Sequence, residues 1–268
     1  MRPRLGQNFL AAPNWQRRVA IAVGAEPSDH IIEIGGGPGD VSALLAATGC
    51  QLTIVELDPA LAAKLRARFA AAERVRVVES DILATDLISL AAAAPAARCR
   101  VFGNLPYYVT SPILFHLFAA AAPFTDATLM MQKEVAARVA SPPGRPSFGL
   151  LSAVCQLHAR PRRLFDLPPG AFRPAPKVTS TLMRLDFIAP LTRPGADTEA
   201  FHAFLRAAFA HKRKRLAGNL SLLAPPERVA AAMAALGLSV NTRAEECGVA
   251  SLVALFRALQ PAPPRDVR

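Results

Sequence analysis

Short apolar runs alternate with helical segments through the first two-thirds of this chain, and this alternation constrains its fold more than any other feature. Strands are predicted at 30–34, 51–55, 75–78, 100–103, 127–131, 151–158 and 181–187, with helices at 40–48 and 59–69. Such an order is typical of a doubly wound, mostly parallel sheet with helices on both faces. Sheets of this kind bind ligands at the carboxyl ends of their strands.

The pattern changes near residue 188. Residues 188–197 (IAPLTRPGAD) contain two Pro and a Gly and predict a linker. Three or four short helices follow, at 198–209, 212–222, 226–236 and 251–259, and the tail at 261–268 is expected to be loose. The sequence therefore predicts an α/β domain at 1–188 and a small all-α domain at 189–268.

Charge and composition narrow the functional classes. The 268 residues include 31 Lys and Arg but 20 Asp and Glu, a formal charge of +11, which favours a partner with a phosphate backbone or an anionic surface. The longest nearly apolar stretch, 87–97, falls well short of the roughly 20 residues that span a bilayer. The N-terminus shows no secretory-type segment, so we expect a bacterial cytoplasmic protein.

Four cysteines are too widely spaced to form a C-x-x-C pair: Cys50, Cys99, Cys155 and Cys247. No His cluster lies near them in the sequence. They are interpreted as buried thiols in a reducing compartment, and neither a disulfide framework nor a metal site is expected.

A glycine-rich turn, EIGGGPGD at 33–40, follows the first predicted strand. Gly35, Gly37 and Gly39 let the backbone approach a bound cofactor closely. A dinucleotide fingerprint needs a third glycine where Asp40 stands, and Pro38 removes one amide donor, so NAD is disfavoured. A cofactor without a pyrophosphate fits better, and the E-x-G-x-G-x-G turn resembles the S-adenosylmethionine loop of Rossmann-like methyltransferases.

Acidic residues end the next two strands. Glu56 comes 17 residues after Gly39, at the end of the second strand, and is placed to accept both hydroxyls of a ribose. Asp81 ends the third strand and can accept from the cofactor's adenine amine, while Ile82 packs on the ring. The alternative for each carboxylate is that it caps the following helix or turn.

The tetrapeptide Asn104-Leu105-Pro106-Tyr107 follows the fourth strand and has the parts needed to hold an amino-bearing base such as adenine. The Asn104 side-chain oxygen and the Leu105 carbonyl can accept the hydrogens of an exocyclic amine. Pro106 restricts the backbone, and Tyr107 offers a ring on which a base can stack for roughly 1–3 kcal/mol. The alternative is an ordinary proline turn with a half-buried tyrosine.

Two clusters of cations are candidates for contacts with RNA phosphates: Arg160, Arg162 and Arg163, and Lys212, Arg213, Lys214 and Arg215. Charge runs are usually solvated surface. The net charge favours a phosphate-binding surface for 212–215, whose binding should weaken steeply with salt.

In this order and spacing, the motifs resemble those of the ribosomal RNA adenine dimethylase family, over residues 5 to about 259. The segments that carry the resemblance are 6–10 (GQNFL), the glycine turn, 55–58 (VELD), 104–107 (NLPY), 132–135 (QKEV), 172–178 (FRPAPKV) and 218–220 (GNL). The resemblance implies a seven-stranded methyltransferase sheet, S-adenosylmethionine as the methyl donor, no metal, and a helical C-terminal domain that helps to grip RNA. The implied activity is dimethylation of N6 on two adjacent adenines near the 3′ end of small-subunit (16S) rRNA, with the assembling small ribosomal subunit as partner. A monomer is expected because nothing in the sequence demands a dimer.

The resemblance also implies roles for individual residues. Contacts to the cofactor are implied for Asn8, Leu10, Gly35, Glu56, Asp81 and Asn104. The target adenine would be held by Asn104, Leu105 and Tyr107, with Phe172 on its other face, although Phe172 can equally be a core residue beside a proline-rich turn. Methyl transfer would be an in-line displacement that depends on positioning.

Other readings remain open at the level of sequence. A large-subunit rRNA adenine methylase of the antibiotic-resistance type would share the pocket, and a non-catalytic RNA-binding assembly factor would share the fold; an NAD oxidoreductase is more distant. The chain departs from the family pattern at Tyr108, where relatives often carry a smaller polar residue, and in a short N-terminal arm before Gly6.

Overall fold

The computed structural model describes residues 8–94, 96–188 and 196–260, without the side chains of 196 and 197. Its contacts divide the chain into two units, residues 1–137 with 159–188, and residues 138–158 with 189–268. Residues 138–158, which the sequence analysis assigned to the α/β domain, therefore group with the C-terminal helices. The N-terminal arm, most of the expected linker and the expected loose tail lie outside the described residues.

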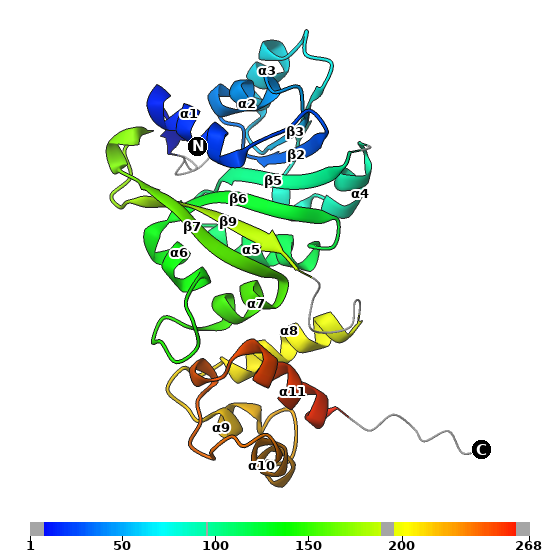
Figure 1. Cartoon of the computed structure of the whole chain (residues 1–268), viewed down its shortest axis with the longest axis vertical. Helices are drawn as coiled ribbons and strands as arrows, with labels where there is room; N and C mark the ends of the chain where they lie inside the picture. Colours follow the sequence, from blue (N-terminus) through cyan, green and yellow to red (C-terminus); the bar gives the residue numbers. More distant parts are fainter. Residues whose placement is uncertain (1–7, 95, 189–195, 261–268) are drawn as a thin grey trace, which may run out of the picture. The chain divides into compact units, whose positions relative to one another are not determined.

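The first unit is built on a seven-stranded sheet (Figure 1). Its strands, in spatial order, are β4 (Val75–Glu79), β3 (Gln51–Glu56), β2 (Asp29–Ile34), β5 (Arg98–Asn104), β6 (Phe124–Gln132), β9 (Ser180–Phe187) and β7 (Ala159–Leu167). The first five are parallel, and β9 runs antiparallel to both of its neighbours. This order confirms the predicted Rossmann-like α/β fold.

The order of the strands also locates the point where a ligand is expected. The chain moves outward from β2 through β3 to β4, and then returns to the other side of β2 as β5. The carboxyl ends of β2 and β5 meet where Ile34 pairs with Gly103. Crevices at such switch points are the usual binding sites of doubly wound sheets.

Helices α1 (Pro13–Val23), α2 (Asp40–Ala46) and α3 (Pro59–Arg68) lie on one side of the strands, and α4 (Leu87–Ala92) and α5 (Thr110–Ala119) on the other (Figure 1). Proline begins both α1 and α3, where its missing N–H is not needed. The Asp58 carboxylate caps α3 by accepting from the amides of Ala60 and Leu61. The apolar faces of the first three helices close a core over the sheet that includes Val19, Leu45, Ile54 and Leu65.

A short ribbon brings the start of the chain to this unit. Strands β1 (Phe9–Leu10) and β8 (Phe172–Arg173) pair antiparallel, with Leu10 opposite Phe172. The amides of Ala11 and Ala12 both donate to the Ala171 carbonyl, at 2.9 and 3.1 Å. The segment before α1 is thereby fixed at the same edge of the sheet as the glycine turn.

The prediction of a strand at 151–158 is wrong, because these residues form the helix α7 (Leu150–His158). Nearly all of its side chains are buried, so no polar face marks the 3.6-residue period, and a short apolar run of this kind does not distinguish strand from buried helix. The strand is the next segment, β7. The arginines and Pro161 of β7 break the apolar alternation by which a strand is recognised in a sequence. Proline is tolerated there because β7 lies at the edge of the sheet.

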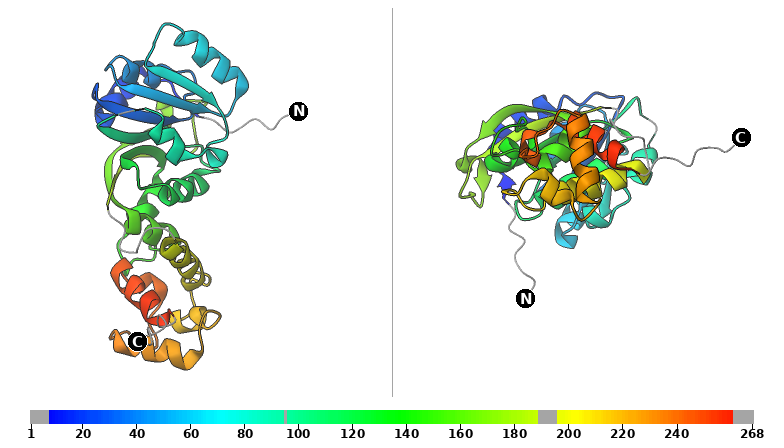
Figure 2. Two further views of the ribbon diagram at one scale, coloured as in Figure 1. Left: turned by 90° about the vertical axis from the view of Figure 1, so that its right-hand side faces the viewer. Right: turned by 90° about the horizontal axis from the view of Figure 1, so that it is seen from below.

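The second unit contains α7 and the helices α8 (Ala196–Ala208), α9 (Leu216–Leu220), α10 (Pro226–Ala235) and α11 (Val249–Leu259), with a 3-10 turn, η3 (Ala244–Glu246); Figure 2 shows α8 to α11 gathered in one group. The rings of Phe201, Phe204 and Phe256 pack together with centroids 5.2 to 5.8 Å apart. The four predicted helices are present, but residues 212–215 form a turn before α9 and not its first turn. No helix of the described chain is long and apolar enough to cross a membrane.

Candidate active site

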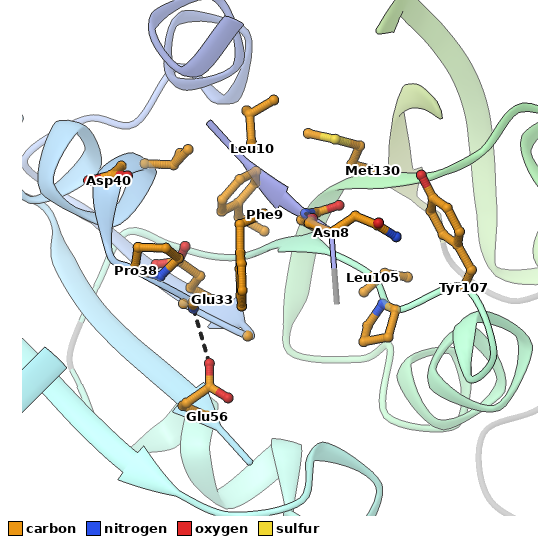
Figure 3. A pocket seen from close by; sticks show the side chains of 17 residues that line it. Asn8, Phe9, Leu10, Glu33, Pro38, Asp40, Glu56, Leu105, Tyr107 and Met130 are labelled. Carbon is orange, nitrogen blue, oxygen red and sulfur yellow. Dashed lines mark hydrogen bonds between the residues drawn. The ribbon is translucent and has the colours of Figure 1, made fainter. Parts of the chain in front are cut away.

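A pocket opens at the switch point, and three predicted motifs meet there (Figure 3). It contains about 750 Å³ of space, part of it open to solvent. Its walls are the glycine turn at 35–38, the acids Glu33 within β2 and Glu56 at the end of β3, the segment 104–107, and the N-terminal segment 8–10. Segments that are up to about a hundred residues apart in the sequence thus form one cavity.

The glycine turn adopts a backbone that only glycine accepts easily. Gly35, Gly37 and Gly39 have φ values of +74°, +54° and +84°. A Cβ on Gly37 would lie 2.8 Å from Cδ1 of Phe9, so Phe9 packs directly on the turn. Gly39 does not line the pocket; a Cβ there would lie 2.8 Å from Cδ2 of Leu65. The need for glycine at 39 therefore comes from its positive φ and from close packing on α3.

Replacing Gly37 with alanine is expected to weaken binding of S-adenosylmethionine about tenfold, or roughly 1.4 kcal/mol. The new methyl group must displace Phe9 at the pocket wall and holds an alanine in the left-handed region. Isothermal titration with the cofactor measures the effect. The control is Gly144→Ala, which also places an alanine at a positive φ (+81°) but has open space around it. Equal affinity of the two variants would contradict this account.

Glu56 connects the turn to the end of β3. Its Oε2 accepts from the Gly37 amide and its Oε1 from the Asp58 amide, both at 3.0 Å, and only 2% of the residue is exposed. A carboxylate offers about four acceptor positions, so these two bonds leave capacity for a pair of ligand hydroxyls. The predicted ribose contact is compatible with this geometry.

Asp81 and Ile82 do not line the pocket. The Asp81 Oδ1 accepts from the Leu83 amide at 2.9 Å and caps the 3-10 turn η1 (Ile82–Ala84). Asp81 Oδ1 thus makes the capping bond that the sequence offered as the alternative to a ligand contact. Contacts of Asp81 and Ile82 with a cofactor adenine remain predictions.

Asn104 and Leu105 both present acceptors at the pocket wall. The Asn104 Nδ2 donates to the Asn8 carbonyl at 2.8 Å, which fixes the side-chain amide and leaves Oδ1 available. The Leu105 amide donates to the Met130 carbonyl at 2.9 Å. Within the described part of the chain, no donor pairs with the Leu105 carbonyl oxygen. Two oxygen acceptors are thus held on adjacent residues by bonds to their own nitrogens.

Tyr107 is fixed by a hydrogen bond between its hydroxyl and Ser180 Oγ, at 2.6 Å. Burial raises the pKa of the phenol, and the bond to Ser180 offsets part of this rise, so the hydroxyl stays neutral. Its ring lies beside Leu105 at the pocket wall (Figure 3). Tyr108 is 61% exposed and does not line the pocket.

Phe172 was predicted to lie on the other face of the target base, and this role stays a prediction. It is 2% exposed, belongs to the apolar core with Leu10 and Leu182, and does not line the pocket. The alternative reading, a core residue beside a proline-rich turn, describes this arrangement. Phe172 pairs with Leu10, which lines the pocket, so it helps to hold this part of the pocket wall in place.

Glu33 is the site residue that the sequence analysis named only as part of a motif. It lies at the pocket wall, 2% exposed, and its Oε2 has no hydrogen-bond partner in the described structure. Burial raises the pKa of this carboxyl to about 7; the Glu56 charge acts in the same direction, and the Ser42 hydroxyl offsets part of the shift. The sequence feature that could have identified Glu33 is an acid within the largely apolar strand HIIEI, because a carboxylate is costly to bury without a partner.

The charges of the pocket favour a cationic ligand. Three of the described lining residues are acids, Glu33, Asp40 and Glu56, and none is Lys, Arg or His. Asp40 is paired with Arg68 at 2.9 Å. Glu33 and Glu56 have no such counter-ion, so a positive ligand group would relieve their repulsion.

The two basic clusters differ in their surroundings. In β7, Arg162 pairs with Asp186 at 2.6 Å and Arg163 pairs with Asp166, while Arg160 is exposed. Residues 212–215 are all exposed, and within the described residues none of the four cations has an acidic partner. The second cluster therefore presents the stronger uncompensated charge.

Sheet order, glycine turn and strand-end acids together define a Rossmann-like methyltransferase. Residues 1–261 match the family described as Ribosomal RNA adenine dimethylase. The chain belongs to this family.

Individual relatives agree. The chain is 44% identical over 260 residues to the Ribosomal RNA small subunit methyltransferase A of Acidobacterium capsulatum, covering 97% of this chain and 91% of that protein. It is 39% identical over 267 residues to the protein of the same name from Koribacter versatilis, covering 96% and 94%.

Among solved structures, the 23S rRNA methyltransferase ErmE is similar with a TM-score of 0.70 and 26% identity, covering 94% of this chain and 99% of that one. A dimethyladenosine transferase from Plasmodium falciparum gives a TM-score of 0.75 at 20% identity, covering 92% and 95%, a likeness of fold.

Proposed function

We propose that the protein transfers methyl groups from S-adenosylmethionine to N6 of two adjacent adenines near the 3′ end of small-subunit rRNA. The observation that carries this proposal is the pair of oxygen acceptors on Asn104 and Leu105, in the same pocket as the glycine turn. The similarity to relatives named as small-subunit rRNA methyltransferases supports the choice of RNA.

The residues of the pocket fit this cofactor. When bound, S-adenosylmethionine supplies an electrophilic methyl group on a positively charged sulfur. Glu33 and Glu56 give the pocket an uncompensated negative charge that suits such a ligand. Glu56 can accept from two hydroxyls while it holds the turn, and the lack of a side chain at Gly37 lets Phe9 pack directly on the turn at the pocket wall.

The target amine needs to be oriented more than activated. The lone pair of an exocyclic adenine nitrogen is delocalised into the ring, so acceptors that hold its two hydrogens direct the nitrogen toward an electrophile. Asn104 Oδ1 and the Leu105 carbonyl can take this role, and the Tyr107 ring can stack on a base extruded from its RNA. After one methyl transfer the amine must rotate and present its remaining hydrogen to the same acceptors. The proposal therefore requires that N6-methyladenine also fits.

The test measures transfer of label from S-adenosylmethionine to unmethylated small and large ribosomal subunits, followed by digestion of the RNA to nucleosides. We expect N6,N6-dimethyladenosine from the small subunit and no label in the large one. Label confined to the large subunit would identify a methylase like the similar 23S rRNA enzyme. Cofactor binding without transfer to either subunit would indicate a non-catalytic RNA-binding role.

A further inference from the structure

The uncompensated cations at 212–215 occupy a sharp turn whose shape must be maintained against their repulsion. The turn, residues 211–215, lies between α8 and α9 in the sequence, and all five residues are exposed. Four adjacent positive charges repel one another. Backbone bonds oppose this at two places, where the Lys214 amide donates to the His211 carbonyl at 3.0 Å and the Leu216 amide donates to the Thr242 carbonyl at 2.8 Å.

A side chain from α9 supplies a third attachment. The Asn219 Nδ2 donates to the carbonyl of Ala208, the last residue of α8, at 2.6 Å, and to the carbonyl of His211, the first residue of the turn, at 3.2 Å. Both partners are acceptors, so only the NH₂ end of the amide can face them. Asn219 is 4% exposed, and its buried Oδ1 has no partner among the described residues. Burying an unpaired amide oxygen is unfavourable. We therefore infer that asparagine is present at 219 because of the two hydrogen bonds that its Nδ2 donates.

We propose that Asn219 is a positioning residue for RNA, which fixes the turn at 211–215 so that its four cations are presented as a preorganised phosphate-binding surface. The inference rests on the proposed function, because it takes RNA as the partner of the turn. Phosphate contacts on a rigid backbone avoid the ordering cost that a flexible basic loop incurs on binding. Asn219 itself is buried and contacts no ligand.

The principal variant is Asn219→Asp, which keeps the size of the side chain but replaces both donors with an acceptor that faces two carbonyl oxygens. The matched control is Asn241→Asp, in the same unit. Asn241 is exposed, and its side chain makes no hydrogen bond within the described chain. The two variants therefore change the net charge equally, and only one removes the attachment.

Binding is measured with a hairpin RNA whose loop contains two adjacent adenines, at several salt concentrations. We expect Asn219→Asp to weaken binding about tenfold more than Asn241→Asp does, or roughly 1.4 kcal/mol. The affinity for S-adenosylmethionine, bound in the first unit, should stay unchanged. Equal losses in the two variants would overturn the inference.

A second background separates positioning from a general structural role. In a variant that carries Lys212→Gln, Arg213→Gln, Lys214→Gln and Arg215→Gln, adding Asn219→Asp should have little further effect on RNA binding, because residues that act as a unit are not additive. A full further loss in this background would overturn the inference. If Asn219→Asp does not fold, as judged by circular dichroism, Asn219→Ser, which keeps one donor, is compared in the same two backgrounds, with an intermediate loss expected.

The outcomes distinguish the inference from the proposed function. If the four-cation variant binds the hairpin as the wild type does, the turn is not an RNA surface, and both the RNA role of 212–215 and the inference fail. If that variant binds weakly while Asn219→Asp binds as its control does, the RNA role stands and only the positioning role of Asn219 fails.

Discussion

Replacing Asn104 with alanine is expected to lower the turnover of methyl transfer to the small ribosomal subunit by roughly 100- to 1,000-fold, the range seen when one preorganised polar group is removed from an active site. The substitution removes the Oδ1 acceptor for the adenine amine. It also removes the bond from Nδ2 to the Asn8 carbonyl, which links the end of β5 to the N-terminal wall of the pocket. Single-turnover kinetics with labelled cofactor measures the loss.

The comparison variants for Asn104 separate orientation of the base from binding of the cofactor. Asn104→Asp keeps an oxygen in place and should retain more activity than alanine, although it loses the bond to Asn8. Asn241→Ala removes an exposed amide far along the sequence and serves as the neutral control. Turnover of Asn104→Ala within a few-fold of the wild type, with normal cofactor affinity, would exclude Asn104 as the group that orients the amine.

Much of the first unit is predictable because its signals are local. Proline at the first position of α1 and α3, the capping carboxylate Asp58 and the buried β-branched runs each specify an element within a few residues. The motifs at strand ends could be placed at one edge because parallel strands end together. The strand prediction at 151–158 is wrong, and strand β7 after it was not predicted, for the opposite reason. The helix α7 is buried on all sides and β7 lies at the edge, so neither shows the periodicity on which the sequence analysis depends.

Roles within the site were harder to predict than its location. Whether a strand-end acid faces a ligand or caps the next turn depends on a side-chain rotation that no sequence pattern reports, and Asp81 shows the capping bond. The family resemblance implied a contact between Phe172 and the target base, whereas the structure shows its pairing opposite Leu10 and its packing in the core. Glu33 was passed over because it sits inside a strand. Its importance comes from its burial at the pocket wall with Oε2 unpaired, which only the three-dimensional structure reveals.

Replacing Glu33 with glutamine is expected to have opposite effects on stability and on cofactor binding. Burial raises the pKa of this carboxyl from 4.5 to about 7, so the folded protein carries the cost of an ionised buried group at neutral pH. Removing that charge should stabilise the apo protein by at most on the order of 3 kcal/mol above pH 7, as the pKa difference implies. The same change removes half of the uncompensated charge that suits a cationic cofactor, and we expect affinity for S-adenosylmethionine to fall about 10- to 100-fold at pH 8, or roughly 1.4–2.7 kcal/mol.

The pH dependence of both effects follows from the direction of the pKa shift. Between pH 4.5 and 7 the folded state binds more protons at Glu33 than the unfolded state, so this residue lowers stability progressively as the pH rises through that window. The stability gain of Glu33→Gln should therefore be small below pH 4.5, grow up to about pH 7 and then level off. Binding of a cation favours the ionised carboxylate, so the affinity advantage of the wild type should grow over the same window and be accompanied by proton release.

Thermal unfolding and calorimetric titration across this pH range, with Glu73→Gln as an exposed-glutamate control, distinguish this arrangement from a purely structural one. A glutamate that only supported the fold would lose stability when replaced by glutamine, and cofactor affinity would fall with it. A variant that is more stable and binds less cofactor would identify Glu33 as a residue whose unfavourable burial is retained for ligand binding. Unchanged affinity together with increased stability would mean that the cofactor's positive charge lies elsewhere in the pocket, and would leave Glu56 as the candidate counter-ion.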